Sequence, residues 1–247
     1  MHRTAVKSFL KHGHTYHLYT YGGVKNVPEG VILKNANEII PEDQYFTTEN
    51  KDFKGIHAAF SDLFRYRLLY LRGGWWVDTD VVCLKPFDMD QQKVICSVYH
   101  GDEDKVRAST FVLKFPPNDP FLKKAWTLSL EKVRGMDQYE EVGPMLMRKL
   151  VEEEKESGSL APYHYFSPVS WYNTYNSIVF KQASLVHTLK MLLRPVLKPK
   201  LAKAMHLHKD SFGVHLWGEM WRGAGINANE RFAQKCLFEK LKKQYLN

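Results

Sequence analysis

The stretch GGWWVDTDVVCL, residues 73–84, places Asp78 and Asp80 inside a run that otherwise has the composition of a buried strand. Burying an unpaired carboxylate is costly or forces it to take up a proton. Alternate residues of an extended chain share a face at a rise of about 3.3 Å per residue, so the two carboxylates would lie about 6–7 Å apart. A bound divalent cation would replace the hydration that the two carboxylates lose and would cancel the repulsion between them. Carboxylate oxygens suit Mg²⁺ or Mn²⁺. The alternatives are a pair of polar residues on an exposed edge strand, or a surface aspartate with a partner on a helix, and the apolar flanks disfavour both.

The segment before this run predicts a helix over residues 55–72. Its apolar residues recur at helical spacing, and Gly73-Gly74 end it. Asp62 and Arg65 are three positions apart and lie opposite the apolar stripe. Taken alone, such a pair is most simply a surface ion pair worth a few tenths of a kcal/mol. One tight turn before two further carboxylates, it could instead help to bind a polyhydroxylated, phosphorylated ligand, because aspartate accepts from hydroxyls and arginine donates as a planar fork.

Strands and helices alternate through the first half of the chain. The pattern predicts a helix over residues 2–12, a strand over 15–21, and a short strand and helix over 30–40. Further strands are expected near 93–99 and 110–115, and helices after Pro120 and Pro144, with an irregular aromatic stretch before a C-terminal helix over 229–246. This alternation predicts an α/β fold with a mainly parallel sheet, in one domain covering residues 1–247.

Composition sets broad limits on the function. The chain has 247 residues, 44% hydrophobic and 25% charged, and no stretch approaches the roughly 20 apolar residues that cross a bilayer. The N-terminus has no secretory signal, and the three cysteines are scattered, which suits buried thiols in a reducing compartment. A cytoplasmic protein is expected.

The net charge of +8 is concentrated in residues 181–209, which contain seven Lys or Arg, three His and no acidic residue. This segment is either a solvated basic helical face broken at Pro195 and Pro199, or a peripheral contact with anionic lipid at the inner face of a membrane. No nucleic-acid-binding motif is present, so specific nucleic-acid recognition is not expected.

The run FSDLFRYRLLYLRGGWWVDTD, residues 60–80, resembles the sugar-binding segment of the DXD glycosyltransferases. These are glycosyltransferase family 32 and its relatives, which include yeast-type α-mannosyltransferases, α-1,4-galactosyltransferases and clostridial glucosylating toxins. A bare D-x-D occurs widely by chance, whereas the combination of Asp62, Arg65, Gly73-Gly74, Asp78 and Asp80 is specific. The resemblance extends more loosely over most of the chain, including Gly143-Pro144 and residues 214–222.

The resemblance implies a GT-A-type α/β/α nucleotide-sugar-binding sandwich. Residues 1–118 would form the nucleotide-sugar half, and residues 119–247 the acceptor side with a C-terminal metal- and phosphate-binding segment. The resemblance implies that the metal ligands are Asp80, Asp78 and His215. It implies contacts with the donor sugar or ribose by Asp62, Arg65 and Asp78, and a contact with the diphosphate by Trp217. Further implied substrate-binding positions are Gly73, Gly74, Trp76 and Gly143. The alternative for residues 215–217 is a core histidine beside packed tryptophans.

The implied reaction is metal-dependent transfer of a hexose from a UDP- or GDP-sugar to a glycan or lipid-linked acceptor, as in polysaccharide biosynthesis, with retention of configuration and no protein nucleophile. The cofactor would be Mn²⁺ or Mg²⁺. Aromatic residues of 162–175 either stack on acceptor sugars or pack in the core. Family members usually begin with a strand that lines the base pocket, whereas this chain begins at the following helix, so we expect the base to be bound differently or by residues upstream. A metal-dependent phosphohydrolase and a catalytically weak nucleotide-sugar-binding module are the competing functions.

Overall fold

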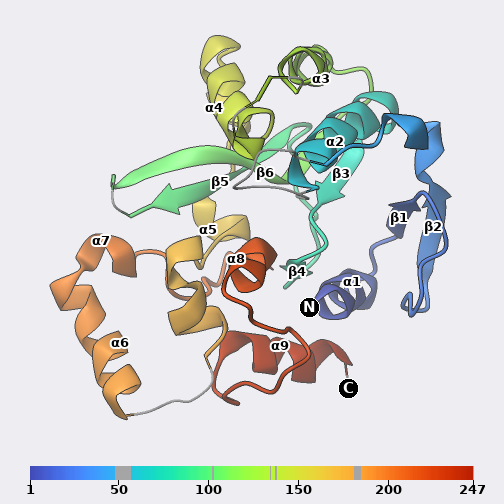
Figure 1. Ribbon diagram of the computed structural model, residues 1–247. Helices are drawn as coiled ribbons and strands as arrows, with labels where there is room; N and C mark the ends of the chain where they lie inside the picture. Colours follow the sequence, from blue (N-terminus) through green and yellow to red (C-terminus); the bar gives the residue numbers. More distant parts are fainter. Residues whose placement is uncertain (48–56, 102, 134, 137, 181–184, 247) are drawn as a thin grey trace.

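The computed structural model describes residues 1–47, 57–101, 103–133, 135–136, 138–180 and 185–246 (Figure 1). The strands are β1 Tyr16–Thr20, β2 Val31–Asn35, β3 Gly74–Val77, β4 Val81–Cys83, β5 Val94–His100, β6 Lys105–Phe115 and β7 Gly213–His215. The α-helices are α1 His2–Lys11, α2 Ala58–Arg72, α3 Pro120–Lys132, α4 Pro144–Glu153, α5 Tyr163–Phe166, α6 Leu185–Leu197, α7 Pro199–Ala202, α8 Gly218–Gly223 and α9 Leu237–Leu246. The α/β fold class predicted from the sequence is confirmed.

The strands of the described residues form three small sheets. β1 and β2 pair in parallel, β6 lies between β3 and β5, and β4 pairs with β7. Because β6 is antiparallel to both of its neighbours, β3 and β5 run in the same direction. Parallel pairing was expected for most of the sheet and is found between β1 and β2; the other pairs are antiparallel. β6 follows β5 after a short connection, and a short connection can join only antiparallel neighbours.

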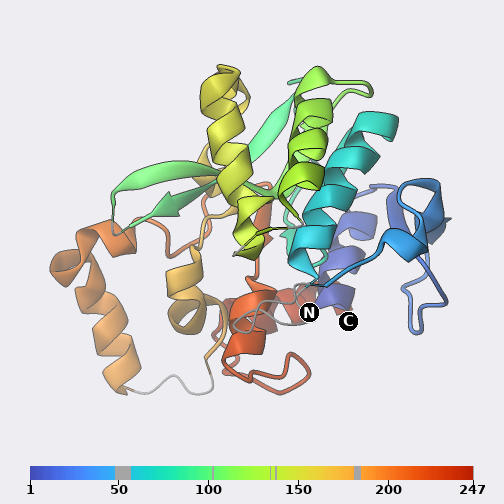
Figure 2. The ribbon, with the colours of Figure 1, turned by 45° about the horizontal axis from the view of Figure 1, so that its top comes forward.

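Helices cover both faces of the β3–β6–β5 sheet. Figure 2 shows α2, α3 and α4 side by side along one face. Ile95 and Leu113 point to that side and join a buried cluster with residues of those helices. The neighbouring Cys96 and Val112 point the other way, into a cluster that includes Phe9 of α1 and Phe166 of α5. This alternation follows from the two-residue period of a strand and gives three layers, α/β/α.

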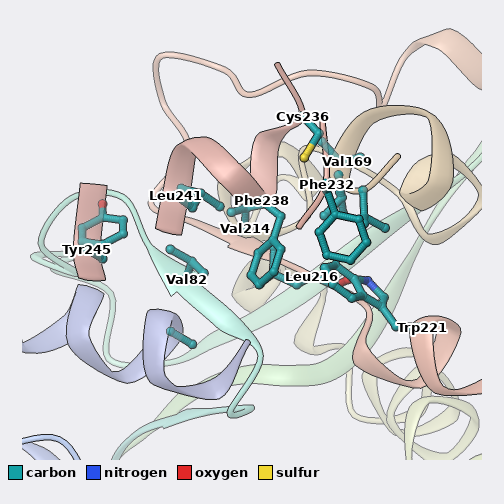
Figure 3. Close-up of a cluster of buried hydrophobic side chains, with 13 residues drawn as sticks. Val82, Val169, Val214, Leu216, Trp221, Phe232, Cys236, Phe238, Leu241 and Tyr245 are labelled. Atoms are coloured by element: carbon teal, nitrogen blue, oxygen red, sulfur yellow. The ribbon is translucent and has the colours of Figure 1, made fainter. Parts of the chain in front are cut away.

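A second part of the core attaches the C-terminal segment to the rest of the fold. Val82 of β4 and Val214 of β7 are fully buried in it, with Trp221 of α8 and Phe238 of α9 (Figure 3). All three cysteines are free and buried, as expected. The packing of β7 against β4 brings residue 215 next to the DXD segment, because Val81 lies opposite His215 in the strand pair.

Three local predictions differ from the structure. Asp78 and Asp80 lie in a turn between β3 and β4 rather than inside one strand, since the chain leaves the β6 edge at Val77 to pair with β7. The C-terminal helix begins at Leu237 rather than near residue 229. α6 continues through Pro195 to Leu197, while Pro199 begins α7, as a proline can at the first helical position.

Two predicted segments extend beyond the described residues. Gly55 and Ile56, at the start of the expected 55–72 helix, are outside them, and so is 181–184 of the basic segment. In the described part of the chain, no helix has both the length and the apolar character needed to cross a membrane.

Gly73 forms the junction between α2 and β3. Its φ of 64° is in the left-handed region, and a Cβ built there would lie 2.7 Å from Pro117. The helix therefore ends at the residue where only glycine is tolerated, and the chain reverses directly into the strand that leads to Asp78.

We predict that Gly73→Ala lowers the free energy of unfolding by about 2–4 kcal/mol, because it combines left-handed strain with overpacking against Pro117. Urea denaturation followed by circular dichroism measures the change. Gly23→Ala is the matched control, since no atom lies within 4 Å of a Cβ at that position and its φ is not positive. Equal stability of the two variants would contradict the prediction.

Candidate active site

A cavity of about 1950 Å³ opens between α2, the turn formed by Asp78, Thr79 and Asp80 (the DXD turn), and the C-terminal segment around residues 215–229. Nearly all of the residues that the sequence singles out line it, namely Asp62, Arg65, Gly73, Gly74, Trp76, Asp78, Asp80, His215 and Trp217. Gly143 is not among the lining residues, although its neighbour Pro144 is. The fold thus brings together predicted site residues from two distant parts of the sequence, 62–80 and 215–217.

Arg65 is buried at the floor of this cavity and joins two carboxylates. Its Nε lies 3.2 Å from Asp62 Oδ1, and its Nη1 lies 3.2 Å from Asp78 Oδ1. The guanidinium also donates to the backbone oxygen of Thr110 at 2.7 Å and to the backbone and side-chain oxygens of Ser61. The pair read from the sequence as a surface ion pair is therefore buried, and Arg65 directs its donors at protein atoms.

Asp62 occupies a tight site between Arg65 and the start of α4. Burial raises the pKa of Asp62 to about 6, and the Arg65 charge opposes this rise. A Cβ placed on Gly143 would overlap the Asp62 carboxylate. Gly143 therefore makes room for the Asp62 carboxylate, and the substrate contact predicted for Gly143 stays a prediction because the residue does not line the cavity.

The two aspartates of the DXD turn differ in their surroundings. Burial raises the pKa of Asp78, the Arg65 charge opposes the rise and the nearby Asp80 adds to it. Burial alone would raise the pKa of Asp80 too, but the charge and hydrogen bond of His215 and the Gly218 amide lower it to about 2. The His215 ring nitrogen Nε2 lies 3.1 Å from Asp80 Oδ1, and the Gly218 amide donates to Oδ2 at 2.7 Å. Like charges at close range push the two carboxyl groups apart in acidity.

Asp78, Asp80 and His215 form a cluster suited to a divalent cation. One ligand atom from each lies within 4.8 Å of the others. The ring of His215 stacks on Phe111 with centroids 4.3 Å apart, and its Nδ1 is buried without a hydrogen-bond partner. Two carboxylate oxygens and one imidazole nitrogen form a mixed ligand set that Mn²⁺ accepts, so the residues present fit Mn²⁺ of the two predicted ions.

Two tryptophans border the cluster. The Trp76 indole N–H donates to Asp78 Oδ1 at 2.7 Å, and its ring lies 4.9 Å from the Arg65 guanidinium carbon. Trp217 adopts left-handed backbone angles, and its indole N–H donates to the Val169 backbone oxygen at 2.7 Å. In this structure Trp217 borders the cavity with its N–H already engaged, so its diphosphate contact stays a prediction.

Three further residues contribute to the site and were not predicted from the sequence, namely Ser61, Thr110 and Gly218. Gly218 holds Asp80 through its amide, and a Cβ there would lie 3.0 Å from Asp80 Oδ2. Ser61 and Thr110 hold Arg65. Ser61 could have been found from its place directly before Asp62 in the Ser-Asp-x-x-Arg motif, whereas the Thr110 carbonyl is a backbone group for which the sequence carries no signal.

Comparison with known proteins bears on the same segment. Residues 27–96 match the family model described as glycosyltransferase sugar-binding region containing DXD motif. Among solved structures, PaToxG Glycosyltransferase is similar at 12% identity, over 99% of this chain and 79% of that chain, with a TM-score of 0.45. No curated protein is significantly similar in sequence. The family match confirms the resemblance to DXD glycosyltransferases and supports a transferase.

We predict that Gly143→Ala displaces the Asp62 carboxylate and lowers the free energy of unfolding by about 2–4 kcal/mol, because the added methyl group takes the place of a buried ion-pair partner. Denaturant unfolding measures the loss. Gly158→Ala, where no atom lies within 4 Å of the new Cβ, is the control and should be nearly neutral. If both variants unfold at the same denaturant concentration, the assigned contact is wrong.

We predict that Asp80→Asn and His215→Gln each weaken Mn²⁺ binding at least about 100-fold, since loss of a partner outside the ligand set already costs about 10–100-fold. Titration calorimetry with the metal alone measures the affinity. Asp43→Asn removes an exposed carboxylate away from the cluster and should bind as the unchanged protein does. Unaltered Mn²⁺ affinity in both site variants would exclude this cluster as the metal site.

Proposed function

We propose that this chain is a metal-dependent, retaining glycosyltransferase of the family 32 type, which moves a hexose from a UDP- or GDP-sugar to a glycan or glycolipid acceptor. The observation that carries the proposal is the meeting of Asp78, Asp80 and His215 in one large cavity, within and beside the segment that matches the glycosyltransferase family model. Polysaccharide biosynthesis is the process such an activity fits. The buried free cysteines suit the reducing conditions of the cytoplasm, where we place it.

The proposed roles follow the contacts. Asp78, Asp80 and His215 hold Mn²⁺ or Mg²⁺, which when bound would offset the charge of the leaving diphosphate. Asp62 accepts from hydroxyl groups of the donor sugar or ribose. Arg65 was expected to contact the donor sugar; its contacts support a role in holding Asp62 and Asp78 in place.

The division of the chain into a donor and an acceptor side is part of the proposal. The donor would bind against residues 1–118, where α2 and the DXD turn lie, and the acceptor would enter from residues 119–247. Trp171 supports an acceptor surface, because it lines the cavity with 38% of its area exposed. Aromatic faces stack on sugar rings, whereas Phe166 of the same aromatic stretch is fully buried in the core.

The competing phosphohydrolase has less support. Enzymes of that class commonly use two metal ions about 3.5–4 Å apart, which needs a second set of ligands. Among the described residues, Asp78, Asp80 and His215 are the one group of three or more metal-ligating side chains that lie close enough together.

The test is an assay of nucleotide release from a panel of UDP- and GDP-hexoses with Mn²⁺. We expect release of UDP or GDP that EDTA abolishes and that Asp80→Asn lowers at least about 100-fold, because cation-assisted departure of the diphosphate carries the reaction. Asp43→Asn should keep full activity. Phosphate release from generic esters would favour the phosphohydrolase, and donor binding without turnover would favour the binding module.

A further inference from the structure

Helix α6, Leu185–Leu197, exposes an unusual amount of apolar surface. Figures 1 and 2 place it at the edge of the molecule, beyond α5 and next to α7. Seven of its aliphatic side chains are between 49% and 79% exposed, namely Leu185, Val186, Leu189, Leu192, Leu193, Val196 and Leu197. Scattered single exposed leucines are ordinary, but a continuous set on one helix indicates an interaction surface.

The exposed aliphatic residues share one side of the helix. At 100° per residue they fall within an arc of about 140°. Met191 and Arg194, which are partly buried, lie on the opposite side and face the protein. The apolar side of α6 is therefore turned away from the core, the reverse of a helix that contributes to the fold of its own chain.

Cations border this apolar side. Lys190 is exposed and follows the edge of the aliphatic arc, and Lys198 and Lys200 are exposed just beyond the end of the helix. No acidic residue occurs from Leu185 to Lys209. A parallel contact between two copies of α6 would bring these like charges together, whereas an anionic lipid surface accepts both the aliphatic residues and the lysines.

We propose that α6 docks this protein on membranes that contain anionic phospholipids. The helix lies in the plane of the interface with its aliphatic side among the acyl chains, and Lys190, Lys198 and Lys200 contact the headgroups. At 13 residues it is about 20 Å long, too short to span a bilayer and suited to lying on one. This inference goes beyond the proposed function and does not depend on it, because it concerns where the protein is held rather than which bond it forms.

Vesicle flotation tests the docking, with phosphatidylcholine vesicles alone or with phosphatidylglycerol added. The full chain should float with the anionic vesicles and much less with the neutral ones, and added salt should release it. Leu189→Gln and Leu192→Gln should each weaken binding at least about tenfold, because each leucine loses its transfer into the acyl layer. Lys190→Gln should weaken binding to anionic vesicles about fivefold.

The matched control is Leu33→Gln on β2, which alters a leucine with a similar exposed fraction (50%) elsewhere on the surface and should leave binding unchanged. Circular dichroism and thermal melting check that all variants fold. Equal flotation with both kinds of vesicle, or loss of binding in Leu33→Gln to the same extent, would overturn the proposal. So would a dimer in sedimentation that Leu192→Gln dissociates, since a second copy would then cover α6.

Discussion

The site depends on one buried cation. Arg65 lies between Asp62 on its own helix and Asp78 at the end of β3, and it also donates to the Thr110 carbonyl of β6. A guanidinium taken out of water must find partners for all of its donors, and here three different elements supply them. The charge requirement of one side chain therefore fixes the helix, the sheet and the DXD turn relative to one another.

The second carboxylate is held by a different part of the chain. Asp80 accepts from His215 and from the Gly218 amide, which β7 and α8 provide. Asp78 is thus tied to the N-terminal half and Asp80 to the C-terminal segment, although only Thr79 separates them. A cation bound between them would connect both halves, so the apolar cluster around Val82, Val214 and Trp221 contributes to the site by keeping β7 against β4.

Sequence patterns identified residues that the structure brings to one cavity and predicted the fold class, but not the strand directions around that cavity. The helix before the glycine pair and the two aspartates were identified because periodicity and charge in a buried run are local signals. The antiparallel direction of β6 and the turn at Asp78 were not predicted. Both depend on strand partners far along the chain, because β3 pairs with β6 and β4 pairs with β7. Gly143 was predicted as a site residue from the family resemblance alone. Its close approach to the Asp62 carboxylate, which leaves no space for a side chain, is visible only in the folded structure. Gly218 was missed because a backbone amide leaves no mark in the sequence.

The pairing of β4 with β7 has a consequence for how the protein acquires its site. The hydrogen bond from the Gly218 amide to the Asp80 carboxylate joins residues 138 positions apart in the chain. Contacts of such long range close large loops and form slowly. During synthesis Asp78 and Asp80 leave the ribosome well before His215 is added to the chain. The two carboxylates therefore lack the His215 ligand until the C-terminal segment has been made. Assembly of the cation-binding cluster is therefore expected to be a late event of folding, reported by the burial of Trp221 rather than by formation of α2.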